Sequence, residues 1–174
     1  MTLKPIETHY NGYRFRSRLE ARVAVFLGAL GVKYYYEPEG YRLRGGTMYL
    51  PDFYLPDQDF FLEVKGIMGE ADMNKIAQLH SESGKGVLIV DPDLNIEIMD
   101  SKERDWCGGI GRCSIYGCAD CGKINFLRGE NAYSCPCCGA WEGDHLLVSI
   151  DARVAWAMKQ ARQARFEHGE VPRG

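Results

Sequence analysis

The chain has 174 residues and a mass of 19.6 kDa, which suits one domain, or one domain with a small addition. Hydrophobic residues make up 45%, charged residues 26%, and the mean hydropathy is −0.30, a composition typical of soluble globular proteins. The sequence has no apolar run of about eighteen residues and no apolar N-terminal segment, which argues against a membrane span and a secretory signal. We therefore expect a cytoplasmic protein with no membrane partner.

The net charge of −3 is unevenly distributed. The first 22 residues carry five basic and two acidic side chains, and residues 151–174 carry five basic and three acidic ones. The stretch between them is acidic. Basic patches attract phosphate groups, and acidic clusters attract cations. The pattern is compatible with a nucleic-acid partner, although ordinary solvated surface charge explains it equally well.

In chain order, a capping box at Ser17–Glu20 predicts the start of a helix that ends at Gly31. Strands are expected over residues 32–37, 47–55, 59–65 and 86–90, and the last of these is apolar throughout, as in a strand buried on both faces. A second helix is indicated by the spacing of Met73, Ile76, Ala77 and His80. We predict an α/β domain over residues 1–105, with a mixed sheet flanked by helices.

All seven cysteines lie between Cys107 and Cys138. Two Cys-x-x-Cys-Gly elements can each turn two thiolates toward one ion, because the glycine permits a tight reversal of the chain. Four thiolates form the closed tetrahedral set that Zn²⁺ prefers, with no open position for chemistry. We predict a zinc ribbon over residues 106–148 whose structural ion is bound by Cys118, Cys121, Cys135 and Cys138.

Disulfides or unrelated buried thiols are the alternative, although an odd number of cysteines fits a fully paired framework poorly. Cys107, Cys113 and Cys137 have no assigned role, and Cys113 or His145 could replace one of the four ligands. Between the two elements, residues 123–128 and 132–134 are expected to pair as a short hairpin.

The segment 149–174 is predicted to hold a basic helix over residues 151–167. Its basic residues recur every three positions and would form a stripe beside an apolar face made by Val154, Met158 and Ala161. Such a helix can pack on protein and face phosphate, although a solvated surface helix has the same pattern. The candidate DNA-binding residues of this stripe are Lys159, Arg162 and Arg165.

Alternation along strand 59–65 places Phe61, Glu63 and Lys65 on one face. Asp52 lies on the preceding strand, and antiparallel pairing would bring it to Glu63 and Lys65. Two close carboxylates repel each other unless a cation lies between them, and oxygen ligands suit Mg²⁺ or Mn²⁺. A cross-strand salt bridge is the alternative, but Pro51 inside a strand is unusual without an edge or a special role.

Pro51-Asp52 followed by Glu63-Val64-Lys65 matches the PD-(D/E)xK nuclease motif. A longer ordered block, spread over about half of the chain, resembles the bacteriophage endonuclease I type of Holliday-junction resolvases; its segments are Phe15–Glu20, Tyr34–Glu37, Leu50–Pro56 and Glu63–Gly66. The resemblance implies a restriction-endonuclease-like fold, metal-dependent cleavage of DNA, a homodimer, and the host cytoplasm if the protein is phage-encoded. The cysteine segment departs from that family and leaves the shape of the substrate open.

The resemblance also implies roles for individual residues. Asp52, Glu63 and the Val64 carbonyl would bind the metal, and Lys65 would orient or activate the attacking water. Glu20 would reach a second metal or its water, in addition to or instead of capping its helix. The residues that would contact phosphates are Arg14, Arg16 and Arg18.

The expected function is therefore a metal-dependent DNA endonuclease that acts on branched DNA. Two alternatives stay open at this point. The chain could be a general nicking or degrading phage nuclease, or an inactive zinc-ribbon module that only binds DNA. The complete set of acidic residues with Lys65 argues against the inactive module.

Overall fold

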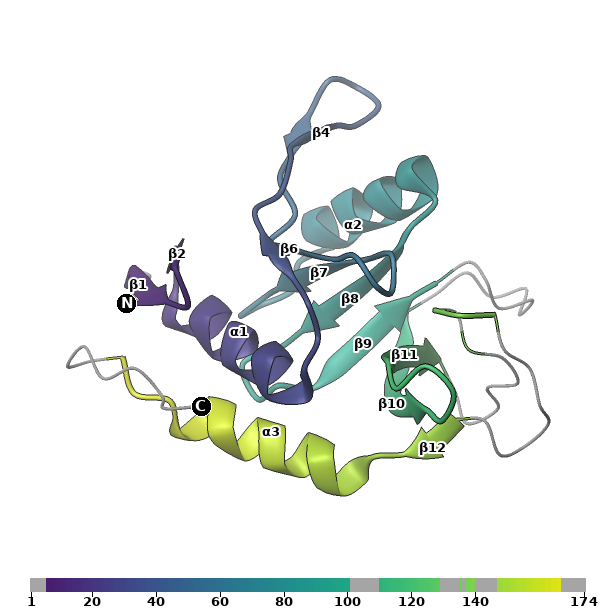
Figure 1. Cartoon of the computed structure of the whole chain (residues 1–174). Coiled ribbons are helices and arrows are strands. Elements are labelled where there is room, and N and C mark those ends of the chain that lie inside the picture. Colours follow the sequence, from purple (N-terminus) through teal and green to yellow (C-terminus); the bar gives the residue numbers. More distant parts are fainter. Residues whose placement is uncertain (1–5, 101–109, 129–134, 136, 140–146, 167–174) are drawn as a thin grey trace.

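The computed structural model describes residues 6–100, 110–128, 135, 137–139 and 147–166, and Figure 1 shows their arrangement. The fold is mixed α/β, and none of the described helices is long and apolar enough to cross a lipid bilayer. The helices are α1 (Arg18–Leu30), α2 (Glu70–Ser83) and α3 (Asp151–Gln163). The strands before α2 are β1 (Thr8–Tyr10), β2 (Tyr13–Phe15), β3 (Tyr35–Tyr36), β4 (Tyr41–Arg42), β5 (Met48–Tyr49), β6 (Phe53–Leu55) and β7 (Phe60–Val64). The strands after α2 are β8 (Gly86–Val90), β9 (Ile96–Met99), β10 (Gly111–Cys118), β11 (Ile124–Arg128) and β12 (Leu147–Ser149).

A large mixed sheet organises the molecule. Its strand order is β11-β10-β9-β8-β7-β6-β3, and β12 also pairs with β10. Strands β7 and β8 are parallel and are connected by α2, whereas every other described pair is antiparallel. Strand β8 is buried along its whole length, which confirms the prediction for residues 86–90.

Helices cover both faces of this sheet. Helices α1 and α3 share one core with strand residues such as Phe53, Leu62 and Leu88, and α2 covers the opposite face, where Phe61 meets Ile76 (Figure 1). Alternate residues of β7 therefore enter different cores, as its sequence pattern predicts.

Helix α1 forms where its capping box predicts. The Ser17 Oγ accepts a hydrogen bond of 3.1 Å from the Glu20 amide, and Gly31 ends the helix in the left-handed region at φ 70°. The Arg153 side chain of α3 donates to the Leu30 carbonyl at 2.6 Å. That bond satisfies one of the carbonyls that a helix end leaves without an intrahelical partner.

Two predicted strands have different limits in the structure. The expected strand 47–55 is divided into β5 and β6 around Pro51-Asp52, and β5 pairs with β4 in a separate hairpin. The expected strand 32–37 is reduced to β3. The second predicted helix is present as α2, in which Ile76 and Leu79 are buried whereas Ala77 is exposed, because Leu79 occupies the inward position.

Strand β10 joins the cysteine segment to the large sheet. Its first residues, Gly111 and Arg112, pair with β9, and the following residues 113–117 pair with β11. The predicted partner of β11, residues 132–134, lies outside the described residues. Helix α3 ends at Gln163, and residue 167 of the predicted helix also lies outside them.

Candidate metal centres

The predicted carboxylate pair is brought together at the junction of β6 and β7. In this antiparallel pair Phe53 lies opposite Leu62, so the next position of the same register places Asp52 opposite Glu63. The Val64 amide donates a hydrogen bond of 2.8 Å to Oδ2 of Asp52. Local pairing and one backbone bond therefore hold the two carboxylates on neighbouring chain segments.

Glu63 is 1% exposed, and its Oε1 has no hydrogen-bond partner among the described residues. The Lys65 Nζ lies 3.4 Å from the other oxygen, Oε2. Burial, and then the Asp52 charge, raise the pKa of Glu63 to about 7. Burial, and also the Glu20 charge, raise the pKa of Asp52 to about 6, although the Val64 amide acts in the opposite direction.

Tyr49 is a part of this site that the sequence analysis does not identify. Its hydroxyl is buried and approaches the Glu63 carboxylate without a hydrogen bond of regular geometry. Burial first, and then the charges of Glu63 and Asp52, raise the pKa of Tyr49, which places the phenol close to both acids. Tyrosine is common in strands, so the residue type alone gives no signal for this role.

The donor set fits a hard divalent cation. A buried carboxylate oxygen without a partner is costly, and two neighbouring carboxylates repel each other. An ion such as Mg²⁺, which accepts oxygen ligands and retains several waters, would relieve both costs. Its waters could also reach the Tyr49 hydroxyl, which lies beside Glu63.

Glu20 lies near this pair, because its charge contributes to the pKa of Asp52, but both of its oxygens are already occupied. Oε1 accepts from Ser17 Oγ at 2.7 Å. Oε2 accepts from the Tyr36 hydroxyl at 2.6 Å and from the Arg16 amide at 3.1 Å. The capping role of Glu20 is thus visible in the structure, and its role as a metal ligand stays a prediction.

The N-terminal arginines are largely engaged within the protein. Arg14 pairs with Glu7 and Arg16 pairs with Glu37, and Arg18 is only partly exposed. On α3, the Arg162 side chain donates to the Asp93 carbonyl at 2.7 Å. Lys159 on α3 and Arg165 just beyond its end are exposed and make no such bond to the described part of the chain.

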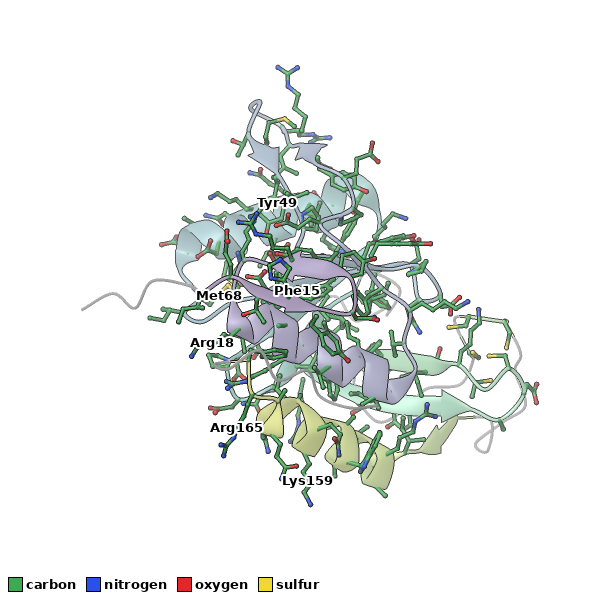
Figure 2. The ribbon with its side chains drawn as sticks, turned by 60° about the vertical axis from the view of Figure 1, so that its left-hand side comes forward. Phe15, Arg18, Tyr49, Met68, Lys159 and Arg165 are labelled. Carbon is green, nitrogen blue, oxygen red and sulfur yellow. The ribbon has the colours of Figure 1, made fainter. Side chains whose placement is uncertain are left out.

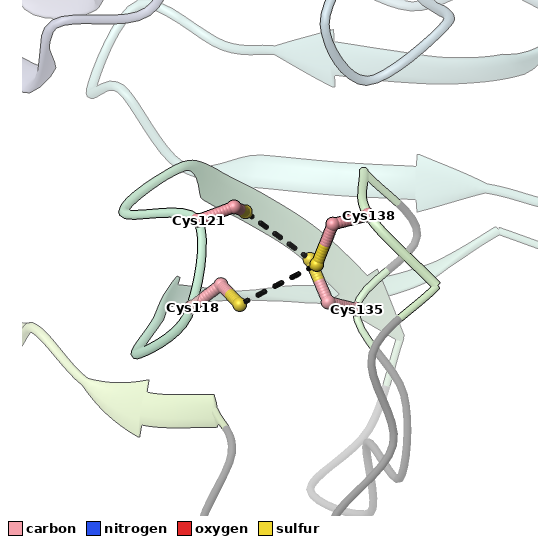
Figure 3. A group of neighbouring side chains, drawn as sticks. All are labelled: Cys118, Cys121, Cys135 and Cys138. Carbon is pink, nitrogen blue, oxygen red and sulfur yellow. Dashed lines mark hydrogen bonds between the residues drawn. The ribbon is translucent and has the colours of Figure 1, made fainter.

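The four predicted cysteines form a second cluster. Their sulfurs all lie within 4.8 Å of one another; Cys118 and Cys138 are 3.9 Å apart, and Cys121 and Cys135 are 3.8 Å apart (Figure 3). Four sulfurs at about 2.3 Å from one zinc ion lie about 3.8 Å from each other. The spacing is therefore that of a four-thiolate metal site, because the sulfurs of a disulfide would lie only about 2.05 Å apart.

The glycine that follows each pair makes the predicted reversal. Gly122 and Gly139 have φ values of 69° and 70°, and their amides donate to the Cys118 and Cys135 carbonyls at 2.9 and 2.8 Å. A side chain at either position would favour a different backbone conformation. Both elements consequently present their sulfurs in the same way.

The surplus cysteines fall into different environments. Cys113 lies on β10 outside the cluster, and burial raises its pKa to about 12. The Cys137 sulfur contacts Oδ1 of the buried Asn125 at 3.3 Å, next to Cys135. Cys107 and His145 lie outside the described residues. Among the described residues, Cys113 therefore does not replace a ligand.

Comparison of the chain with protein-family models finds no matching family, and no curated protein matches its sequence.

Proposed function

We propose that this protein is a metal-dependent DNA endonuclease with a PD-(D/E)xK active centre and a restriction-endonuclease-like fold. The observation that carries the proposal is the pair of acids formed by the partly buried Asp52 and the buried Glu63, with Lys65 3.4 Å from Oε2 of Glu63. A purely structural salt bridge would not place a second acid beside a buried carboxylate, because like charges repel each other.

Each residue of the site would have a separate role in phosphodiester hydrolysis. Asp52, Glu63 and the Val64 carbonyl would hold Mg²⁺ or Mn²⁺, which supplies charge stabilisation and a more acidic bound water. The Lys65 ammonium would orient the attacking water and offset negative charge on the phosphate. Glu20, which is held by Ser17 and Tyr36, would extend the acidic site on the α1 side.

The proposed DNA-binding surface lies beside this centre, on α1 and α3. The two helices are antiparallel, because Arg153 near the start of α3 contacts the end of α1 at Leu30. Arg18 of α1 and Arg165, just beyond the end of α3, extend to the same side of the molecule, and Lys159 lies within α3 (Figure 2). Cations on one side of an acidic centre can bind the phosphates that flank the cleaved bond.

We further propose that the four cysteines hold a structural Zn²⁺ in a zinc ribbon, and that branched DNA is the preferred substrate of a homodimer. A junction has approximate two-fold symmetry, so two identical subunits could each cut one strand. The branched substrate and the dimer rest on the resemblance to Holliday-junction resolvases.

The test is cleavage of supercoiled plasmid, four-way junction and matched linear duplex with Mg²⁺ or with EDTA. We expect Mg²⁺-dependent cleavage, fastest on the junction. Equal rates on all three substrates would indicate a general nuclease. Cleavage of none would contradict the proposal and favour a DNA-binding module.

Substitutions of the site residues test whether cleavage of DNA takes place at this centre. Asp52→Asn, Glu63→Gln and Lys65→Met should each lose most of the cleavage rate while the protein stays folded, because these side chains would act on the metal and water. Glu97→Gln is the matched control, since Glu97 is an exposed acid on β9. Wild-type rates in any of the three site variants would remove that residue from the mechanism.

A further inference from the structure

Strands β4 and β5 form a projecting hairpin over residues 41–49, which we call the arm. Its turn contains Gly45 and Gly46, with φ values of 88° and 84°, and the Leu43 amide donates to the Thr47 carbonyl at 2.8 Å. The arm extends away from the sheet, on the opposite side from α3 (Figure 1). At its base lies Tyr49, whose buried hydroxyl is near Glu63.

The inner face of the arm is fixed to the body. Leu43 is 3% exposed and shares a core with Phe61 and Leu79, and the Tyr41 ring packs edge-on against Phe61 with 5.0 Å between ring centroids. The Arg44 amide donates to both carboxylate oxygens of Glu82, at 3.0 and 3.2 Å. The arm is therefore preorganised, which lowers the entropy cost of binding.

The outer face of the arm carries two exposed positive charges. Alternation turns Arg42 and Arg44 outward while Leu43 points inward, and both arginines are exposed. Among the described residues, neither guanidinium makes an ion pair or a hydrogen bond. Met48 pairs with Arg42 across the hairpin and is 67% exposed, so an apolar side chain lies beside the two cations.

We propose that this outer face, made by Arg42, Arg44 and Met48, is a second DNA-contact surface that holds the duplex on the far side of the active centre from α1 and α3. A two-stranded ribbon fits the major groove of duplex DNA, and free arginines bind the phosphates along it. The inference rests on the proposed nuclease function, because DNA is the polyanion that this function brings to the arm.

The test compares DNA binding by two double variants with equal charge loss. R42Q/R44Q removes the cations of the arm. K33Q/R112Q removes two exposed cations from elsewhere, in the loop after α1 and on β10. Binding of a labelled duplex is measured in EDTA, over about 50 to 200 mM salt, and cleavage of the same duplex is measured with Mg²⁺.

We expect R42Q/R44Q to weaken binding about tenfold or more, since hydrogen bonds to charged groups are among the stronger ones. The log–log salt slope should become less steep by about 1.8, because each lost phosphate contact removes about 0.9. K33Q/R112Q should keep the wild-type slope, and R42E/R44E should bind more weakly still.

The experiment distinguishes failure of this inference from failure of the proposed nuclease function. If the wild type binds and cleaves DNA and R42Q/R44Q has the same affinity and slope, the arm makes no contact and the inference is wrong while the nuclease proposal stands. If the wild type neither binds nor cleaves DNA, the proposed function fails and the inference fails with it. Melting curves of both double variants verify that the fold is intact, as expected for exposed arginines.

Discussion

The backbone amide of Val64 holds the carboxylate of Asp52 through a hydrogen bond of 2.8 Å. This bond connects the last residue of β7 to the residue before β6, across the same pair that places Glu63 opposite Asp52. Because an amide makes the contact, Asp52 is positioned without a neutralising side chain. The two acids consequently stay close in the metal-free protein, where Lys65 offsets only part of their repulsion and their pKa values are raised.

The first prediction concerns the pH dependence of the metal-free protein. The pKa values of Asp52 and Glu63 are raised to about 6 and about 7, chiefly by burial. The folded state therefore binds protons more tightly than the unfolded chain, so the contribution of the pair is present near pH 4 and is lost as pH rises through 7. In EDTA, the free energy of unfolding of the wild type should decrease across this range relative to Glu63→Gln, and Mg²⁺ should reverse the loss.

Denaturant unfolding at several pH values measures this difference. Glu97→Gln is again the control, because an exposed acid should leave the pH dependence of the wild type unchanged. A constant stability difference between the wild type and Glu63→Gln from pH 4 to 8 would show that the pair is not strained.

The second prediction separates the two roles of Glu20. Glu20→Gln should cost about 1 kcal/mol of stability or less, since glutamine also serves in a capping box, but should lower cleavage much further if the charge serves a metal. Tyr36→Phe removes the hydroxyl that donates to Glu20 at 2.6 Å and keeps the ring in its core. It should cost about 1 kcal/mol and reduce activity less than Glu20→Gln does.

Thermal melting and cleavage rates, measured on the same samples, decide between these roles. Wild-type turnover and an unchanged Mg²⁺ requirement in Glu20→Gln would leave this residue as a helix cap only.

The third prediction concerns metal in the cysteine cluster. Elemental analysis of protein purified without a chelator should find one zinc per chain, and Cys118→Ser or Cys138→Ser should lower that content. Cys113→Ser is the matched control, because Cys113 lies outside the cluster. Structural zinc contributes about 10–16 kcal/mol of apparent binding free energy in small peptides, so removing it should unfold this segment.

Amide exchange gives a second measurement, because loss of the ion should expose the amides of β10 and β11. Zinc-free protein with an unchanged melting curve would contradict this prediction.

The fourth prediction concerns the core between β7 and β8. A Cβ atom at Gly86 would lie 1.6 Å from Cε1 of Phe60, which is itself buried. Gly86→Ala should therefore destabilise the protein by about 1–3 kcal/mol through overpacking. Gly66→Ala is the control, because no atom lies within 4 Å of a Cβ built there. Equal denaturant midpoints for the two variants would show that Phe60 can move aside.

The elements with local signals could be predicted from the sequence. The capping box and Gly31 define α1, alternation defines the two faces of β7, and the Cys-x-x-Cys-Gly elements define the sulfur cluster. The first hairpin is absent from our prediction although it carries such a signal. Asn11-Gly12 joins β1 and β2 with both residues at positive φ, 47° and 81°, as a two-residue hairpin turn requires.

The remaining features depend on contacts between distant parts of the chain. Nothing near Tyr36 or Tyr49 in the sequence indicates that the first contacts Glu20 or that the second lies near Glu63. The division of 47–55 into two strands depends on the partners β4 and β7. Likewise, β10 pairs with β9 as well as β11, and no local pattern specifies two partners for one strand.

The packing of α3 on α1 has a consequence for synthesis of the protein. The inward positions of α3 are small: Ala157 and Ala161 are buried in the core that includes α1, as is the C-cap residue Ala164. The apolar face of α1 therefore has no helical cover until α3 has left the ribosome. At about 5–20 residues per second, the 133 residues between the ends of α1 and α3 take roughly 7 to 27 s. Throughout this interval the side of α1 that α3 covers in the folded protein lacks its partner helix, so the helix that carries Glu20 gains its full packing only after α3 is made.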